Sequence, residues 1–77
     1  MLNNMVKLVG VPYPVPGMKA RDLAPGSVLV WNGGSTSTVV SIVPSASGKS
    51  LTLTTRTADG RTWTRRTTPD RVFAVRN

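Results

Sequence analysis

The segment from Leu51 to Arg71, LTLTTRTADGRTWTRRTTPDR, constrains the fold more than any other part of this chain. Threonine recurs at alternate positions on both sides of a central Asp-Gly pair. Threonine is β-branched and therefore favours extended backbone, and Asp-Gly between two such runs is a strong turn signal. The segment predicts a β-hairpin, and its five arginines predict that this hairpin is strongly basic.

Short β-rich runs separated by turn residues continue through the rest of the chain after Gly17. They predict five strands, at residues 27–31, 35–43, 50–57, 61–68 and 72–76. The tripeptide Pro69-Asp70-Arg71 predicts a single helical turn before the last strand, and no segment shows a long apolar period of 3.6 residues. Short strands joined by tight turns predict an all-β domain, and the single helical turn favours a small five-stranded SH3-like barrel.

The first 17 residues differ in composition from the remainder. An apolar run around Leu8 can form a short strand, and prolines then fix φ at every second position, at Pro12, Pro14 and Pro16. We therefore expect an extended Pro-rich N-terminal arm at residues 1–17 and the barrel at residues 18–77. Removal of a loosely attached arm would leave the barrel folded. The alternative is that the arm pairs with the domain or with a second copy, which would produce a homo-oligomer.

The length of the hairpin turn decides which face of the sheet Trp63 occupies. A two-residue Asp59-Gly60 loop places Trp63 on the arginine-rich face, as an exposed platform for base stacking. A three-residue loop, with Gly60 in the left-handed region, pairs Thr57 with Arg61 instead. A shift of one residue moves every side chain to the other face.

We favour the three-residue loop, because it places Trp63 beside Leu51 and Leu53 in a core that otherwise lacks large residues. In this register Arg65 emerges near one end of the barrel. The outward-facing residues of the hairpin are then Arg56, Thr62, Thr64 and Arg66. Trp31 is expected to pack in the core or against the arm.

The residue inventory argues against catalysis. The chain has no cysteine, histidine or glutamate, and its acidic side chains are Asp22, Asp59 and Asp70. General acid–base chemistry and metal binding normally need such groups in clusters. We expect a binding protein that is not an enzyme and has no metal or other cofactor. No apolar run reaches the ~20 residues of a membrane span, and Lys7 interrupts the only N-terminal apolar segment, so we expect a cytoplasmic protein without membrane contact.

The charge balance points to an anionic partner. The net charge is +7, and seven of the ten basic residues are arginine, whose planar fork matches phosphate and carboxylate. Nucleic acid, either DNA or RNA, is the expected partner, contacted mainly at its phosphates by Lys49, Arg56, Arg61, Arg65, Arg66 and Arg71. Two alternatives remain open. One is a protein-interaction module that docks on an acidic host or virion protein, and the other is a structural protein that self-associates through its arm.

The order of these segments resembles a known group of proteins. KARDLAPGSVLV, a Gly-Gly turn, TVVSIV, DGRTWTRR, PDR and VFAV follow one another as in small SH3-like barrel proteins encoded by phages of actinobacteria. The resemblance covers residues 19–75 and rests on spacing and turn chemistry. It implies the SH3-like fold and a phage origin, hence a location in the host cytoplasm. The similar KOW and Tudor barrels often bind RNA, DNA or protein tails, although this chain lacks the aromatic cage that methyl-lysine readers need.

Overall fold

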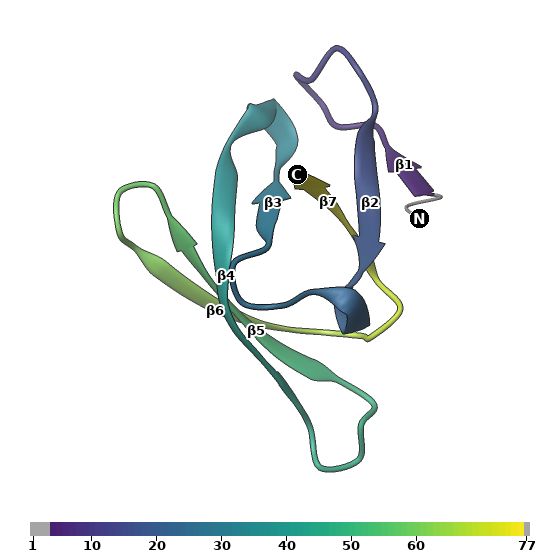
Figure 1. Cartoon of the computed structure of the whole chain (residues 1–77), viewed down its shortest axis with the longest axis vertical. Coiled ribbons are helices and arrows are strands. Elements are labelled where there is room, and N and C mark those ends of the chain that lie inside the picture. Colours follow the sequence, from purple (N-terminus) through teal and green to yellow (C-terminus); the bar gives the residue numbers. More distant parts are fainter. Residues whose placement is uncertain (1–3, 77) are drawn as a thin grey trace.

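A computed structural model describes residues 4–76 and shows an all-β chain with one antiparallel sheet of seven strands (Figure 1). The strands are β1 (Asn4–Val6), β2 (Val15–Lys19), β3 (Val28–Val30), β4 (Thr36–Pro44), β5 (Leu51–Thr57), β6 (Thr62–Thr67) and β7 (Val72–Arg76). Two short 3₁₀ turns, η1 (Ala20–Asp22) and η2 (Asn32–Gly34), lie between strands. Within residues 4–76 there is no helix of the length and apolarity that crossing a membrane requires.

The five predicted strands are present as β3 to β7, but the sheet is not closed. Its order is β1-β2-β7-β3-β4-β5-β6. The last strand, β7, returns to pair with β3, as a five-stranded barrel requires, but its other edge pairs with β2. Because both edges of β7 are occupied in this way, β6 ends the sheet. A closed five-stranded barrel is therefore not what the structure shows.

The predicted helical turn before the last strand is wrong. The N–H of Arg71 donates to the carbonyl of Thr68 at 3.2 Å, which closes a β-turn with Pro69 and Asp70 at its two central positions. Proline fixes φ at a value that suits the second residue of a β-turn as well as a helix, so the tripeptide alone does not distinguish the two.

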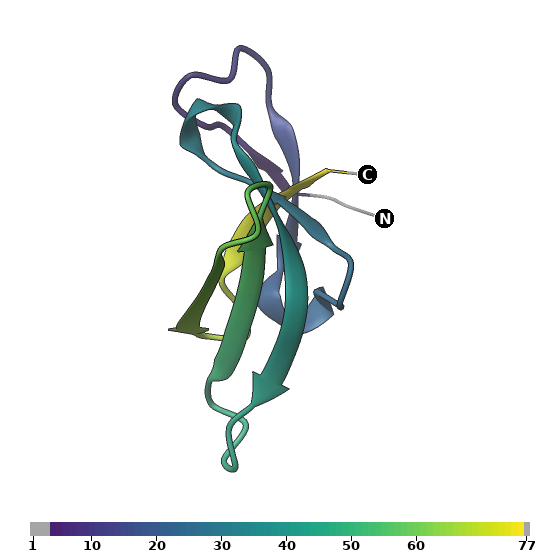
Figure 2. The same ribbon diagram turned by 90° about the vertical axis from the view of Figure 1, so that its left-hand side faces the viewer.

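The N-terminal segment is part of the sheet. Strand β2 crosses the expected boundary at residue 17, and Gly17 pairs with Ala74 of β7. The preceding loop contacts η2, where the N–H of Val9 donates to the Asn32 side-chain oxygen at 3.0 Å. Figure 2 shows this loop lying beside the turn between β3 and β4. Strands β1 and β2 are therefore part of the sheet, which agrees with the alternative that this segment pairs with the domain and not with a loosely attached arm.

The core lies on one face of the twisted sheet and is centred on Leu29, Val39 and Leu53, which are almost completely buried. A β-bulge shifts the register between Val39 and Ser41, so one additional residue is inserted in β4. The bulge lets Val39 and Ile42 face the same core although they are three residues apart, and bulges also bend a strand. Apolar residues on both sides of the bulge can therefore face the core, although Ser41 lies between them.

The predicted three-residue hairpin turn is confirmed. Thr57 donates its N–H to the carbonyl of Arg61 at 2.8 Å, and Gly60 donates to Thr57 at 3.0 Å. The φ of Gly60 is +88°, in the left-handed region. The register of β5 and β6, with Arg56 opposite Thr62, follows from this turn.

Replacing Gly60 with valine should lower the free energy of unfolding by about 1–3 kcal/mol, because a β-branched residue is strained at positive φ. A Cβ at this position would meet nothing within 4 Å, so the loss comes from the backbone and not from a clash. Gly60→Asn is the matched control, since asparagine tolerates this region. Thermal unfolding should rank the variants as wild type, asparagine, valine; equal midpoints for all three would contradict the turn.

Candidate functional site

Trp63 lies on the core face of the sheet but is not in the core. It sits opposite Thr55 and on the same face as Leu51 and Leu53, as the hairpin register predicts. Its side chain is nevertheless 62% exposed, so the expected burial is wrong. Trp63 is exposed because the sheet is open. Strand β6 is the last strand, and the part of its core face near Trp63 lies beyond the packed core residues of β4 and β5.

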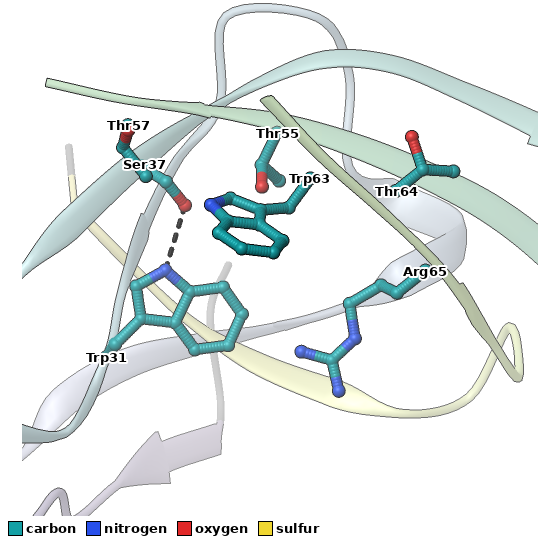
Figure 3. A pocket seen from close by; sticks show the side chains of 7 residues that line it. All are labelled: Trp31, Ser37, Thr55, Thr57, Trp63, Thr64 and Arg65. Carbon is teal, nitrogen blue, oxygen red and sulfur yellow. Dashed lines mark hydrogen bonds between the residues drawn. The ribbon is translucent and has the colours of Figure 1, made fainter. Parts of the chain in front are cut away.

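A cavity of about 540 Å³ lies beside Trp63 and is open to solvent. Ligand sites typically enclose ~300–1,000 Å³. Figure 3 shows the side chains of the residues that line the cavity. Its lining residues are Trp31, Ser37, Thr55, Thr57, Trp63, Thr64 and Arg65. The two tryptophans of the chain therefore meet at one place, although they are far apart in the sequence.

Trp31 is held in position by two contacts. Its indole Nε1–H donates to the Ser37 hydroxyl oxygen at 2.8 Å. The ring also packs edge-on against Phe73, with centroids 6.1 Å apart and planes at 85°. This is a favourable geometry for aromatic pairs, and it fixes the orientation of the indole. The expectation that Trp31 packs against the core is confirmed, and the same side chain forms one wall of the cavity.

Two arginines lie against this aromatic pair. The guanidinium carbon of Arg65 is 5.6 Å from the Trp31 ring centroid and 6.0 Å from that of Phe73. The guanidinium carbon of Arg71 is 5.7 Å from the Phe73 centroid. All three distances fall in the range of cation–π contacts, which orient a guanidinium without neutralising it. The positive charge of Arg65, which lines the cavity, therefore remains available to an anion there.

Arg61 follows the hairpin turn and shares the face of Trp63 and Arg65. Its Nε lies 3.3 Å from a carboxylate oxygen of Asp59. Hydrogen bonds from the Thr57 hydroxyl and from the Arg61 backbone N–H hold the pKa of Asp59 below its ordinary value. Asp59 is therefore ionised at neutral pH and offsets part of the Arg61 charge.

The six basic residues that the sequence proposed as contacts do not share one surface. Arg65 lines the cavity, whereas Arg61 follows the hairpin turn and Arg71 lies against Phe73 beside a separate pocket. Arg56 and Arg66 project from the opposite face of the hairpin, where Arg66 donates to the Ser50 hydroxyl at 3.2 Å. The remaining residue is Lys49. It lies in the loop between β4 and β5, at the other end of β5 from the hairpin turn (Figure 1).

The electrostatics of the cavity are one-sided. None of its seven lining residues carries a carboxylate, whereas Arg65 contributes a positive charge. Trp31 and Trp63 form two walls of an aromatic cage, where the sequence predicted none, but the guanidinium of Arg65 beside them disfavours a cationic ligand. Among residues 4–76 there is no cluster of three or more metal-ligating side chains.

Ser37 and Thr55 also belong to the site, although the sequence did not single them out. Both are buried polar residues at the base of the cavity. The sequence pattern indicated only Thr55. Leu51 and Leu53 occupy the core face of β5, and Thr55 follows on that same face. A polar residue in an apolar series marks the point where the core gives way to the cavity.

No family model, curated protein or solved structure matches this chain. The function is therefore inferred from the cavity, its aromatic walls and the charges around it.

Proposed function

We propose that this protein binds nucleic acid, DNA or RNA, through the face of β6 that carries Trp63, and that it does so without catalysing a reaction. One observation carries the proposal. Trp63, which is 62% exposed, lies between Arg61 and Arg65 on one face of the hairpin, whose strand β6 ends the sheet. A stacking surface flanked by guanidinium groups is the combination that nucleic-acid proteins use to hold bases and phosphates.

Excess positive charge alone would be a weaker argument, because it can serve solubility. Here the charge lies beside an exposed aromatic group that a purely structural hairpin would bury. Phosphate contacts by arginine give affinity with little sequence preference, and stacking accepts any base. We therefore propose binding of low sequence specificity.

We also propose that the protein belongs among the SH3-like barrel proteins of phages and works in the host cytoplasm. The pairing of β7 with β3 supports this family, because it brings the last of the five expected strands back to the first. Strands β1 and β2 would then be additions to this fold, and the pairing of β2 with β7 would take the place of barrel closure. Nucleic acid is accessible in that compartment.

A protein partner is the second candidate, and the sheet edges favour it. Strand β6 ends the sheet, so its outer edge can offer backbone N–H and C=O groups to another strand. An acidic host or virion protein would suit the arginines of this strand. Strand β1 ends the sheet on the other side, where a second copy could pair and form a homo-oligomer.

Two charge-matched double variants test the nucleic-acid proposal. Arg61→Ala with Arg65→Ala removes two charges beside Trp63, whereas Arg56→Ala with Arg66→Ala removes two from the opposite face of the same hairpin. If Arg61, Arg65 and Arg71 each meet one phosphate, log affinity should fall with log salt with a slope of about −2 on single strands and nearer −3 on duplexes. The first variant should flatten the single-strand slope to about −0.7, and the second should leave it near −2.

Fluorescence anisotropy with labelled DNA and RNA oligonucleotides measures these slopes. If the two double variants flatten the salt slope equally, net charge alone determines binding and the Trp63 face has no special role. If neither nucleic acid binds below ~100 μM at low salt, the nucleic-acid proposal is wrong, because even non-specific binders reach ~10⁻⁴ to 10⁻⁶ M. The protein-interaction module then takes its place.

A further inference from the structure

We propose that the cavity between Trp31 and Trp63 receives one unpaired nucleobase, so that the protein prefers single-stranded nucleic acid to duplex. This inference rests on the proposed function and specifies its ligand. It depends on three features of the cavity: its planar walls, the hydroxyl groups at its base, and the charge at its rim.

The walls suit a flat, uncharged ring. Trp31 is already fixed by its hydrogen bond to Ser37 and by the edge of Phe73, so its orientation need not be ordered on binding. Figure 3 shows Trp31, Trp63 and Arg65 directed toward the same space. Indole rings and guanidinium planes are the groups on which splayed-out bases stack.

The base of the cavity carries hydroxyl groups that can pair with a base edge. Ser37 accepts a hydrogen bond from Trp31 and still has its own hydrogen to donate. Figure 3 shows the Thr55 hydroxyl directed toward the cavity. A hydroxyl both donates and accepts, so these two groups can meet the edge of any of the bases. The cavity therefore predicts little discrimination between bases.

The positive charge at the cavity favours a nucleotide over other ligands that pack against aromatic rings. Arg65 lines the cavity, so its positive charge would attract a phosphodiester attached to the base. A methylated lysine would enter beside a guanidinium with no carboxylate among the lining residues. A base within a duplex is stacked and paired on both sides, and it must leave the helix before it can lie between two indoles.

Tryptophan fluorescence provides a direct test. Trp31 and Trp63 are the only tryptophans of the chain, so the whole indole emission reports on this cavity. We expect a single-stranded adenine oligonucleotide to quench this emission as it binds. An abasic oligonucleotide of equal length and charge should bind more weakly and leave the emission nearly unchanged. A duplex of the same length should also quench it little.

The variants Trp63→Ala and Trp63→Phe separate stacking from charge. Loss of the indole should weaken binding of the adenine oligonucleotide by roughly 5- to 150-fold, the range for loss of one stacked base, and phenylalanine should restore most of it. Neither variant should change the affinity for the abasic strand. Because Trp63 is exposed, both proteins should fold, and circular dichroism checks that they do.

The outcomes separate this inference from the proposed function. Equal affinity for adenine and abasic strands, with a normal salt slope and no quenching, would overturn the base-binding cavity and leave nucleic-acid binding intact. No binding of any oligonucleotide would overturn both. Quenching by a trimethyl-lysine peptide, with none by the oligonucleotides, would show that the cavity is a site for a methylated protein tail.

Discussion

Replacing Leu53 with alanine should lower the free energy of unfolding by about 2–5 kcal/mol. Leu53 is completely buried at the centre of the core, where it faces Ile42 across the β4–β5 ladder. Removal of its side chain forfeits buried apolar area and leaves a cavity that the surrounding strands cannot fill. A domain of this size has little stability in reserve, so the loss is a large part of the total.

Urea unfolding followed by circular dichroism measures this change, with Val43→Ala as the control. Val43 lies on the neighbouring strand β4 and is 55% exposed, so its truncation should alter stability by no more than about 0.5 kcal/mol. The thermal midpoint of Leu53→Ala should fall by at least about 10 °C. If both variants lost less than about 1 kcal/mol, the core would not be centred on Leu53.

Local features of the fold were predictable because they depend on neighbouring residues. Gly60 and the residues beside it encode the three-residue turn, and that turn alone sets which residues of β5 and β6 face each other. The alternating threonines on each side of the turn indicated both strands of the hairpin, β5 and β6. The boundaries of the five C-terminal strands followed from turn dipeptides such as Asn32-Gly33 and Ser47-Gly48.

Features that depend on distant pairing were not predictable in the same way. Whether a barrel closes depends on which strand occupies the free edge of β7, and nothing local to β7 says that β2 will do so. Prolines at positions 12, 14 and 16 indicated an extended path, which is compatible with both a loose arm and a strand of the sheet. The sequence therefore gave no means of choosing between these two.

The same distinction applies to the site. The division of the hairpin arginines between two faces followed from the predicted turn. The exposure of Trp63 did not, because it depends on an open sheet edge that no local pattern predicts. The meeting of Trp31 with Trp63 depends on β3, β4, β5 and β6 lying in sequence across one sheet. The change from leucine to Thr55 on the core face was the one local sign of the cavity.

Removing residues 1–17 should unfold the protein. The truncated chain would begin at Met18 and would lose most of β2, including the pairing of Gly17 with Ala74. Val15 is buried and lines an apolar cavity with Val30 and Val75, so its loss would expose apolar surface on two other strands. A small sheet that loses an interior strand has few other contacts to keep β7 in place.

A shorter truncation provides the control. Removing residues 1–8 deletes β1, which pairs only at the edge of β2, and leaves Val9, β2 and all pairing with β7. This chain should fold with a lower midpoint, and it should show a cooperative thermal transition and well-dispersed amide signals. The longer truncation should show neither, because it removes strand pairing from inside the sheet and not from its edge. If the chain that begins at Met18 melts cooperatively at the midpoint of the shorter truncation, then β2 contributes nothing to stability, and residues 18–77 are the independent domain that their composition alone predicted.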